Sequence, residues 1–398
     1  MGEYKKSLKI FAVMAVIKEM WLGCLLSVIY FKFVGLNDFK IGLFHLIIAS
    51  SLFFLEIPTG IFADKFGYKK SISLSYFFLF LAFSSYVSAN FFGGGIVIYI
   101  SAFLFAITGA FHSGATSSYI YSIFKIEGKT EKYLDYNSKI GGIGLIFKAG
   151  GALLASFLYN ISEILPYSVQ AVLIFFMFIL SLFLKPIPVI YREKKQTFFD
   201  YSKMALKYFF NSKTVLFLFI FLFFSTIGYE FFNHMLNQNY WLEKDLSITN
   251  IGFLGVFLFL INGILSLFIS DLWKIFGKKY IFSFLAILGI IISFGLYFFD
   301  NFYVIIIFSG LYYFLHSACC KIIDYSLQEA ISQDEIRASI LSTGNMFLTF
   351  MQKGLFLFVG LFALKYSYSE IILIIGGGFG IMALLIGIVQ LFILKNKT

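Results

Sequence analysis

The chain has 398 residues, of which 60% are hydrophobic, 21% aromatic and only 13% charged. Soluble domains carry about 25% charged residues, so this composition excludes a water-soluble globule and predicts a membrane protein. We attribute the net charge of +10 to lysines that face one side of a membrane and its anionic lipids, and we expect no nucleic-acid partner.

Long apolar runs follow one another along the whole chain. Residues 71–124, for example, contain no Asp, Glu, Lys or Arg, which leaves room for two helical spans of about 20 residues each. Strands of a membrane barrel would instead be short segments of alternating polarity. The basic N-terminus is similar to the start of a signal peptide, but the apolar run after it is too long and contains Lys18 and Glu19. We therefore predict an all-α membrane protein with twelve transmembrane helices, at residues 10–33, 41–62, 71–90, 96–122, 138–159, 165–184, 214–236, 249–270, 280–299, 302–324, 338–362 and 370–393.

The lysines and arginines predict the orientation of these spans. With both termini in the cytoplasm, 23 of the 31 Lys and Arg residues fall in the tails and in the loops on the cytoplasmic side. Only Lys32, Lys40, Lys244 and Lys365 then lie in outer loops. Positive residues concentrate on the cytoplasmic side of membrane proteins. We expect a multi-pass protein of the cell (plasma or inner) membrane with both termini cytoplasmic.

The longest interruption between apolar runs is 185–213, which carries seven Lys or Arg residues. It separates an N-terminal six-helix bundle, residues 1–184, from a C-terminal one, residues 214–398. Residues 198–210 of this linker place apolar and basic side chains at helical spacing, and we predict an amphipathic helix that lies on the inner leaflet. A binding site for a cytoplasmic partner is the alternative interpretation.

Similar residues recur in the two halves at a nearly constant distance. Four such pairs indicate two parallel repeats, as in transporters whose halves are related by an axis along the membrane normal. The sequence thus predicts two pseudo-symmetric six-helix bundles. The pairs are Gly67 with Gly277, 210 residues apart, Glu19 with Glu230, 211 apart, Lys148 with Lys353, 205 apart, and His112 with His316, 204 apart.

The segment Gly60-Ile-Phe-Ala-Asp64-Lys-Phe-Gly67-Tyr-Lys69-Lys70 follows the second predicted span. It resembles the loop signature of the major facilitator superfamily (MFS), and residues 270–279 are a weaker copy where that family repeats it. Residues 56–60, 113–114 and 337–342 resemble a bacterial branch of the family that is largely uncharacterised or described as efflux proteins. The resemblance implies the MFS fold and transport by alternating access, and we expect a monomer. Two features depart from the family's antiporters: span 96–122 has no arginine, and residues 144–151 have glycines but no proline.

The same segment has a physical explanation of its own. Gly60 and Gly67 allow helices to approach closely, and Asp64 can accept hydrogen bonds at a neighbouring helix start. Lys69 and Lys70 can anchor at lipid headgroups. The resemblance implies that these five residues form a conformational latch on the cytoplasmic side; a turn that only sets the topology is the alternative.

Six charged side chains lie well inside predicted spans. At about 3 kcal/mol each, six unpaired charges would cost on the order of 18 kcal/mol, which exceeds the stability of an ordinary domain. They must therefore face one another or a water-filled cavity, and a carrier needs such a cavity. The six are Lys18, Glu19, Lys148, Glu230, Lys321 and Lys353.

The pattern of these residues predicts separate roles. Lys148 and Lys353 stand mid-span with no acid within four residues, which favours binding of an anionic or zwitterionic substrate. Glu230 and His234 are a proton store or, equally well, a structural polar pair. The two central histidines also fit satisfied polar groups between helices, and Lys321 with Asp324 fits a structural pair. We assign substrate binding to Lys18, His112, Lys148, His316 and Lys353, and proton coupling to Glu19, Glu56, Glu230 and His234.

The sequence predicts a secondary transporter that exports a small polar, anionic or zwitterionic organic molecule in exchange for protons. Proton-coupled import of an organic anion or zwitterionic nutrient and multidrug efflux of lipophilic compounds are the alternatives. An enzyme is not expected, because no nucleophile–base set is present, and neither a cofactor nor a metal site is expected.

Overall fold

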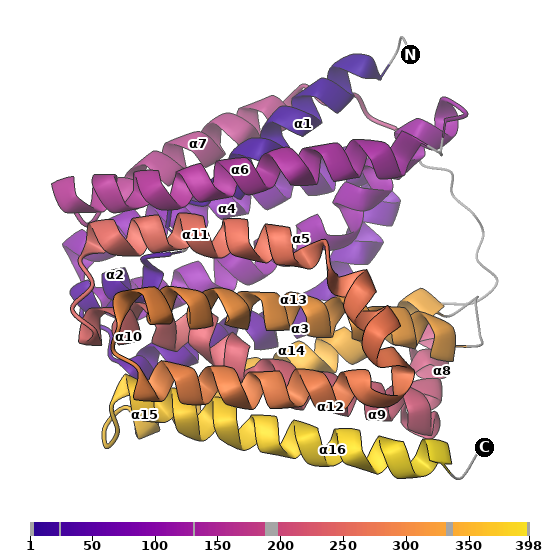
Figure 1. Ribbon diagram of the computed structural model, residues 1–398. Helices are drawn as coiled ribbons and strands as arrows, with labels where there is room; N and C mark the ends of the chain where they lie inside the picture. Colours follow the sequence, from indigo (N-terminus) through magenta and orange to yellow (C-terminus); the bar gives the residue numbers. More distant parts are fainter. Residues whose placement is uncertain (1–3, 24, 130–131, 188–197, 332–336, 396–398) are drawn as a thin grey trace. The chain divides into compact units, whose positions relative to one another are not determined.

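The computed structural model describes residues 4–23, 25–129, 132–187, 198–331 and 337–395, and this part of the chain forms helices and no strand (Figure 1). Eleven of its helical stretches are long and apolar enough to cross a membrane. The remaining predicted span, residues 10–33, is present as two shorter helices. The prediction of an all-helical membrane protein is confirmed.

The chain forms two compact units. The N-terminal unit contains Met1–Glu193 and Ser247–Val256, and the C-terminal unit contains Lys194–Leu246 and Phe257–Thr398. Helix α11 (Ile248–Ser266) is divided between them. The other helices of the N-terminal unit are α1 (Lys5–Glu19), α2 (Ser27–Phe33), α3 (Asp38–Phe66), α4 (Tyr68–Phe92), α5 (Gly94–Ile126), α6 (Lys132–Ile161) and α7 (Leu165–Leu182).

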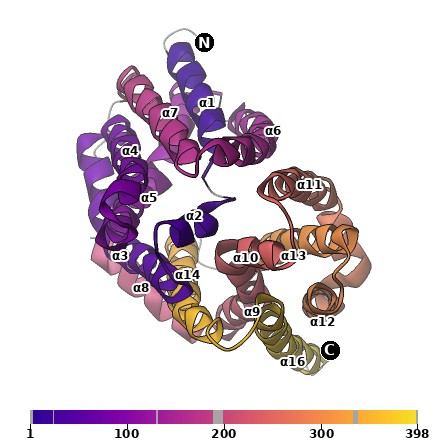
Figure 2. The same cartoon turned by 90° about the vertical axis from the view of Figure 1, so that its left-hand side faces the viewer.

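Small side chains let the helices of the N-terminal unit pack closely. Helix α4 packs against α5 and α7, and α1 packs against α6 and α7, as the view along the helices shows (Figure 2). Ala102, Ala106 and Ala110 repeat every four residues on α5 and are all buried. Such stripes are typical of helix interfaces in membranes, where close packing replaces the hydrophobic effect as the driving force.

The C-terminal unit is built around α9, which contacts α13, α14 and α16 (Figure 2). Helix α12 packs on the outer side against α13 and α16. The helices are α8 (Phe198–Asn211), α9 (Lys213–Phe231), η1 (Phe232–Leu236), α10 (Asn237–Glu243), α12 (Ile269–Phe298), α13 (Phe302–Ala330), α14 (Arg337–Phe362), α15 (Tyr368–Ile372), η3 (Leu373–Gly377) and α16 (Gly378–Lys395), where η marks a π-helix.

Matching hydrogen bonds reveal the repeat. The Tyr30 hydroxyl donates to the carbonyl oxygen of Tyr86 at 2.5 Å, and the Tyr240 hydroxyl donates to that of Leu296 at 2.7 Å. Both bonds join residues 56 apart in sequence, and they are themselves 210 residues apart. The prediction of two pseudo-symmetric bundles is confirmed in this detail as well as in the order of the helices.

The two glycines that are equivalent in the sequence repeat both have a positive φ. Gly67, between α3 and α4, has φ +92°, and Gly277, which kinks α12, has φ +56°. Only glycine adopts these angles without a steric penalty. The weak second copy of the loop segment is therefore a structural equivalent of the first.

The Glu-Ile-Pro-Thr stretch in α3 places a proline inside a membrane helix. Pro58 lacks the N–H that a helix needs, and the helix nevertheless continues to Phe66. The hydroxyl of Thr59 lies 2.9 Å from the Leu55 carbonyl oxygen and 3.0 Å from that of Ala110 on α5. The N–H that Pro58 lacks would donate to the Phe54 carbonyl oxygen, so the Thr59 hydroxyl does not replace that bond; it joins α3 to α5 instead.

The linker forms the predicted helix. Helix α8 spans Phe198–Asn211 and packs against α9 and α14. Ser212 alone separates α8 from α9, and its hydroxyl caps α9 by accepting from the Val215 N–H.

Candidate functional site

A cluster of four ionisable side chains lies inside the C-terminal unit, and we name it the Glu230 cluster. It contains Glu230 on α9, His234 on η1, His316 on α13 and Lys353 on α14. The Lys353 Nζ donates to the Glu230 Oε2 at 3.0 Å. The His234 Nε2 lies 3.4 Å from that oxygen, and the His316 Nε2 lies 3.8 Å from the other carboxylate oxygen. One carboxylate thus faces an ammonium group and two imidazoles.

The packing of α9 brings these groups together. A Cβ at Gly228 would lie 2.3 Å from the Tyr312 hydroxyl and 2.9 Å from the Gly376 Cα, so only glycine lets α9 approach α13 and η3 this closely. The ring of Tyr229 lies 4.1 Å from that of His316. Lys353 lies 4.6 Å above the ring of Phe356, where the negative face of the ring attracts a cation.

The cluster is shielded but not sealed. The side chains of Glu230 and Lys353 are each 15% exposed, and those of His316 and His234 are 24% and 35% exposed. Charges in such surroundings interact more strongly than they would in water. The Nδ1 of His316 is buried without a hydrogen-bond partner among the described residues.

Neutral polar contacts extend the cluster, and sequence reasoning missed them. The Tyr313 hydroxyl donates to Asn233 at 2.6 Å, and Gln352 donates to Thr226 at 3.0 Å. The Sγ of Cys320 lies 3.5 Å from the His316 Nε2. The four-residue spacing of His316 and Cys320 was the one available signal, because the other contacts join distant helices.

The N-terminal unit contains a smaller polar cluster. The Lys18 Nζ donates to the His112 Nε2 at 2.8 Å, which makes that nitrogen an acceptor. The Nδ1 of His112 then carries the hydrogen and donates to the Thr116 hydroxyl at 3.2 Å. Helices α1 and α5 are therefore joined by a lysine and a neutral imidazole.

Lys148 and Glu19 lie on neighbouring helices of the same unit. Glu19 packs against α6, because a Cβ at Gly144 would lie 2.8 Å from its Cγ. Lys148 is half-buried one turn further along α6.

The first span of each half stops being a regular α-helix at its glutamate or one residue after it. Helix α1 ends at Glu19 and α2 begins at Ser27, whereas α9 ends at Phe231, one residue after Glu230, and continues as a π-helix. Broken and π-helical turns in membrane spans are frequent at functional sites.

The break after α1 is held in place from two sides. The Leu22 N–H donates to the Gln170 side chain at 2.8 Å. A Cβ at Gly151 would lie 1.9 Å from the Met20 carbonyl oxygen, so α6 presses on the broken segment. Trp21 adopts the unusual φ of +24°.

The predicted latch residues lie at the corner between α3 and α4. Gly60 is exposed on α3, Gly67 forms the corner, and Lys69 and Lys70 begin α4. The Lys70 Nζ lies 5.7 Å from the centroid of the Phe66 ring. The side chain of Asp64 falls outside the described part of the structure, so the latch remains a prediction.

Two interpretations of the charges need correction. Lys353 has no acid near it in sequence, yet the fold pairs it with Glu230, 123 residues away, so it is not an isolated cation. Lys321 and Asp324 are both exposed and form no ion pair with each other, so the interpretation of these two residues as a structural pair is wrong.

The other predicted polar positions stay apart from the cluster. Ser317 binds Asn262 on α11 at 2.9 Å. Glu56 is half-buried on α3; its carbonyl oxygen accepts from the Thr59 hydroxyl at 3.2 Å, and its carboxylate has no hydrogen bond or ion pair with the residues that the structure describes. Within the described residues, no group of three or more His, Cys, Asp or Glu side chains is arranged to hold a metal ion.

The sequence of this chain is similar to that of one curated protein. A curated relative, the uncharacterized MFS-type transporter YxaM of Bacillus subtilis (strain 168), is 25% identical over 277 residues, which are 67% of this chain. The match spans 63% of the length of YxaM.

Solved structures resemble the whole chain. The nucleoside transporter NupG has a TM-score of 0.77 at 16% identity, with 98% of this chain and 99% of NupG covered. A mutant of NupG has a TM-score of 0.81 at 15% identity, with 97% and 99% covered. A D-xylose-proton symporter has a TM-score of 0.69 at 12% identity, with 97% of each chain covered. These likenesses establish the fold.

The sequence profile of the Major Facilitator Superfamily matches residues 10–323, which include the Glu230 cluster up to His316. Together with the twelve-helix repeat and the glycine corners at Gly67 and Gly277, this match leaves one assignment. The chain belongs to the Major Facilitator Superfamily.

Proposed function

We propose that the protein is a secondary transporter that moves a small organic anion or zwitterion together with a proton. The observation that carries this proposal is the 3.0 Å contact between Lys353 and Glu230. Lys353, the best candidate for substrate binding, is thereby in contact with Glu230, the best candidate for proton binding.

Because of this ion pair, the proton and the substrate anion favour each other's binding. While Glu230 is ionised, it neutralises Lys353, and an anionic group on a substrate would have to displace a carboxylate that is already in place. A proton on Glu230 removes that competitor, so that Lys353 can bind the substrate anion. By thermodynamic linkage, substrate binding then favours protonation to the same degree. Ligands that favour each other's binding travel in the same direction.

The neighbouring imidazole of His316 is poorly placed to take this proton in place of Glu230. The Nε2 of His316 faces the carboxylate, and its Nδ1 has no acceptor. A second proton on this ring would bury an unsatisfied N–H, at a cost of about 1–3 kcal/mol. The neutral ring keeps its Nε2 3.8 Å from the carboxylate, which is too far for a hydrogen bond.

This mechanism favours uptake over export. Where the proton gradient points into the cell, a proton and an anion that bind together are driven inward. A D-xylose-proton symporter with the same fold agrees with such coupling. Export in exchange for protons is the second candidate, because a cationic cargo would compete with a proton for Glu230. It also agrees with the resemblance of residues 56–60 to efflux proteins.

The broader assignments support the same picture. The excess of lysine and arginine in alternate loops supports a multi-pass protein of the cell membrane with both termini in the cytoplasm. The broken span after Glu19 and the π-helix after Glu230 support a site near the middle of the membrane.

The test uses the full chain in proteoliposomes with an imposed pH gradient. Small carboxylic acids, amino acids and nucleosides are screened as radiolabelled probes for accumulation. For a probe that is transported, Glu230→Gln should abolish accumulation driven by the gradient but retain exchange of labelled for unlabelled probe. Lys353→Gln should raise the KM at least tenfold.

A matched control is Glu329→Gln, which removes a carboxylate from an ion pair with Lys278 in which both side chains are exposed. It should leave both properties unchanged. Accumulation of probes only against the direction of proton flow would replace symport by export. Gradient-driven accumulation that survives Glu230→Gln would refute the proposed proton site.

A further inference from the structure

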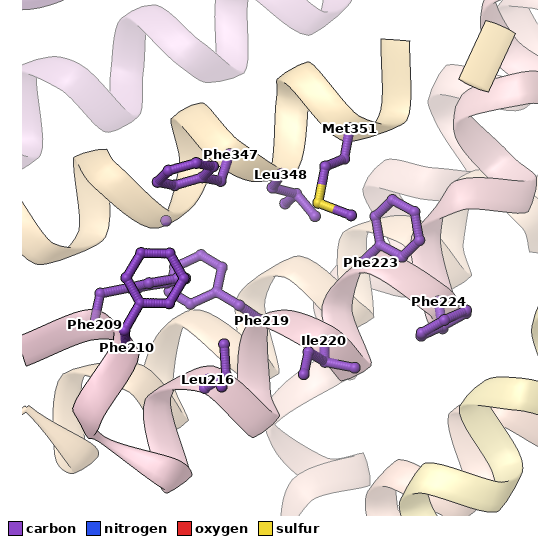
Figure 3. Close-up of a pocket in the computed structure, with 11 residues that line it drawn as sticks. Phe209, Phe210, Leu216, Phe219, Ile220, Phe223, Phe224, Phe347, Leu348 and Met351 are labelled. Atoms are coloured by element: carbon purple, nitrogen blue, oxygen red, sulfur yellow. The ribbon is translucent and has the colours of Figure 1, made fainter. Parts of the chain in front are cut away.

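A cavity of about 210 Å³ lies in the C-terminal unit between α8, α9 and α14 (Figure 3). Its walls are two residues at the end of α8, five on α9 and four on α14, and all of these residues are apolar. None of them belongs to the Glu230 cluster. The transport mechanism proposed above gives this cavity no role.

The cavity has the shape of a short groove along the helices. Its lining residues on α9 recur between Leu216 and Phe224 at helical spacing, which corresponds to a length of about 12 Å. Those on α14 run in the same way from Gly344 to Met351. A Cβ at Gly344 would lie 2.1 Å from the Phe219 ring, so the glycine provides the room in which that ring packs.

One end of the groove is closed and one side is open. Phe209 of α8 is only 4% exposed and packs against Phe219 and Phe347, with ring centroids 5.2 and 6.1 Å apart. In contrast, Ile220 is 40% exposed and Met351 is 53% exposed. Because α9 and α14 are long and apolar enough to cross a membrane, we infer that the open side faces hydrocarbon.

The apolar lining of the cavity indicates which kind of molecule it can bind. An apolar cavity of about 150 Å³ stays dry and binds small hydrocarbons, and this cavity is larger. It offers no polar side chain to a sugar, a nucleoside or an organic acid. A narrow, elongated, apolar groove that opens to lipid fits an acyl chain.

The lysines next to the groove indicate which lipid headgroup would bind there. Residues 194–213 contain five lysines and one aspartate. Lys207 and Lys213 are exposed and flank Phe209 and Phe210 in sequence. Clusters of basic residues on an amphipathic helix at the membrane surface attract anionic lipids.

We propose that this groove binds one acyl chain of an anionic phospholipid from the leaflet at the basic side of the membrane, with the headgroup phosphate on Lys207 and Lys213. The lipid fastens α8 to α9 and α14. It thereby fixes the linker to the unit that carries the Glu230 cluster.

The test is native mass spectrometry of the full-length protein, released from nanodiscs that contain equal amounts of phosphatidylglycerol and phosphatidylcholine with identical acyl chains. The wild type should retain one phosphatidylglycerol in preference to phosphatidylcholine. Leu348→Trp, which fills the groove, should lower this occupancy at least tenfold. Met351→Trp, at the open side, should do the same if the first variant fails to fold. Leu385→Trp, an exposed position on α16, is the matched control and should retain the lipid.

The headgroup contact is tested separately. Lys207→Gln with Lys213→Gln should reduce the preference for phosphatidylglycerol to within twofold of that for phosphatidylcholine. Lys5→Gln with Lys6→Gln, two exposed lysines on α1, should leave it intact. Full retention of phosphatidylglycerol by both tryptophan variants would overturn the proposal. So would a wild-type dimer that either groove variant converts to a monomer, because the occupant would then be a second copy.

Discussion

A double-mutant cycle on Glu230 and Lys353 tests whether the C-terminal unit depends on their charges being present together. With the charged atoms 3.0 Å apart and an effective dielectric constant of about 20, their attraction is about 5 kcal/mol. Removing two charges from water costs several kcal/mol for each ion, so the pair as a whole contributes little. Removing one partner is different, because it leaves the other charge buried and unpaired.

We expect Glu230→Gln and Lys353→Met each to lower the free energy of unfolding by about 3–5 kcal/mol. Glu230→Gln leaves an ammonium group that is 15% exposed beside two neutral imidazoles. Lys353→Met leaves a carboxylate with only the two rings as donors. The double variant has no uncompensated charge, and we expect it to unfold within about 1–2 kcal/mol of the wild type, because replacing a whole buried pair is often neutral.

The measurement is unfolding of the purified protein in mixed detergent micelles, with all four forms under one set of conditions. Glu329→Gln is the control, because Glu329 and its partner Lys278 are 44% and 54% exposed, and exposed pairs contribute about 0–1 kcal/mol. The reasoning is refuted if the single variants lose no more stability than Glu329→Gln, or if their losses simply add in the double variant.

Three further predictions concern the helices that hold the site, and each is measured as a change in the unfolding midpoint. Tyr30→Phe and Tyr240→Phe should each cost about 1–3 kcal/mol, because each leaves a buried carbonyl without its donor; a cost in one half only would contradict the structural repeat. Gly67→Ala should cost about 1–2 kcal/mol through its positive φ, whereas Gly60→Ala, on an open helix face, should be neutral or stabilising. Thr59→Val should destabilise by about 1 kcal/mol, and an unchanged midpoint would exclude the bond to α5.

The repeat and the spans could be predicted from sequence because they depend on regular patterns. A membrane helix requires about 20 apolar residues whatever it packs against, so its position is a local property. The equivalence of Gly67 and Gly277 was visible because a positive φ selects glycine, and the structure gives both that angle. The helix over residues 198–210 was visible from spacing alone.

The pairing inside the Glu230 cluster could not be predicted in the same way. Glu230 and Lys353 are 123 residues apart, and their contact depends on how closely α9, α13 and α14 approach one another. That approach is set by Gly228, which has no sequence signature of its own. The break after α1 was missed as well, because hydropathy reports the apolar character of residues 10–33 and not the hydrogen bonds of their backbone.

The two halves have kept the bonds that hold the fold and have diverged in the groups that do chemistry. Tyr30 and Tyr240 make the same bond at equivalent places, which is what a shared scaffold requires. The centres differ: Lys18 and His112 form a cationic pair without a carboxylate in hydrogen-bond contact, whereas the C-terminal unit has Glu230 against Lys353. In the second arrangement, a single proton on Glu230 turns a neutral ion pair into a lysine cation without its partner charge. If the protein couples transport to protons, we propose that the coupling depends on Glu230 in the C-terminal unit, while the equivalent helices of the N-terminal unit hold Lys18 and His112.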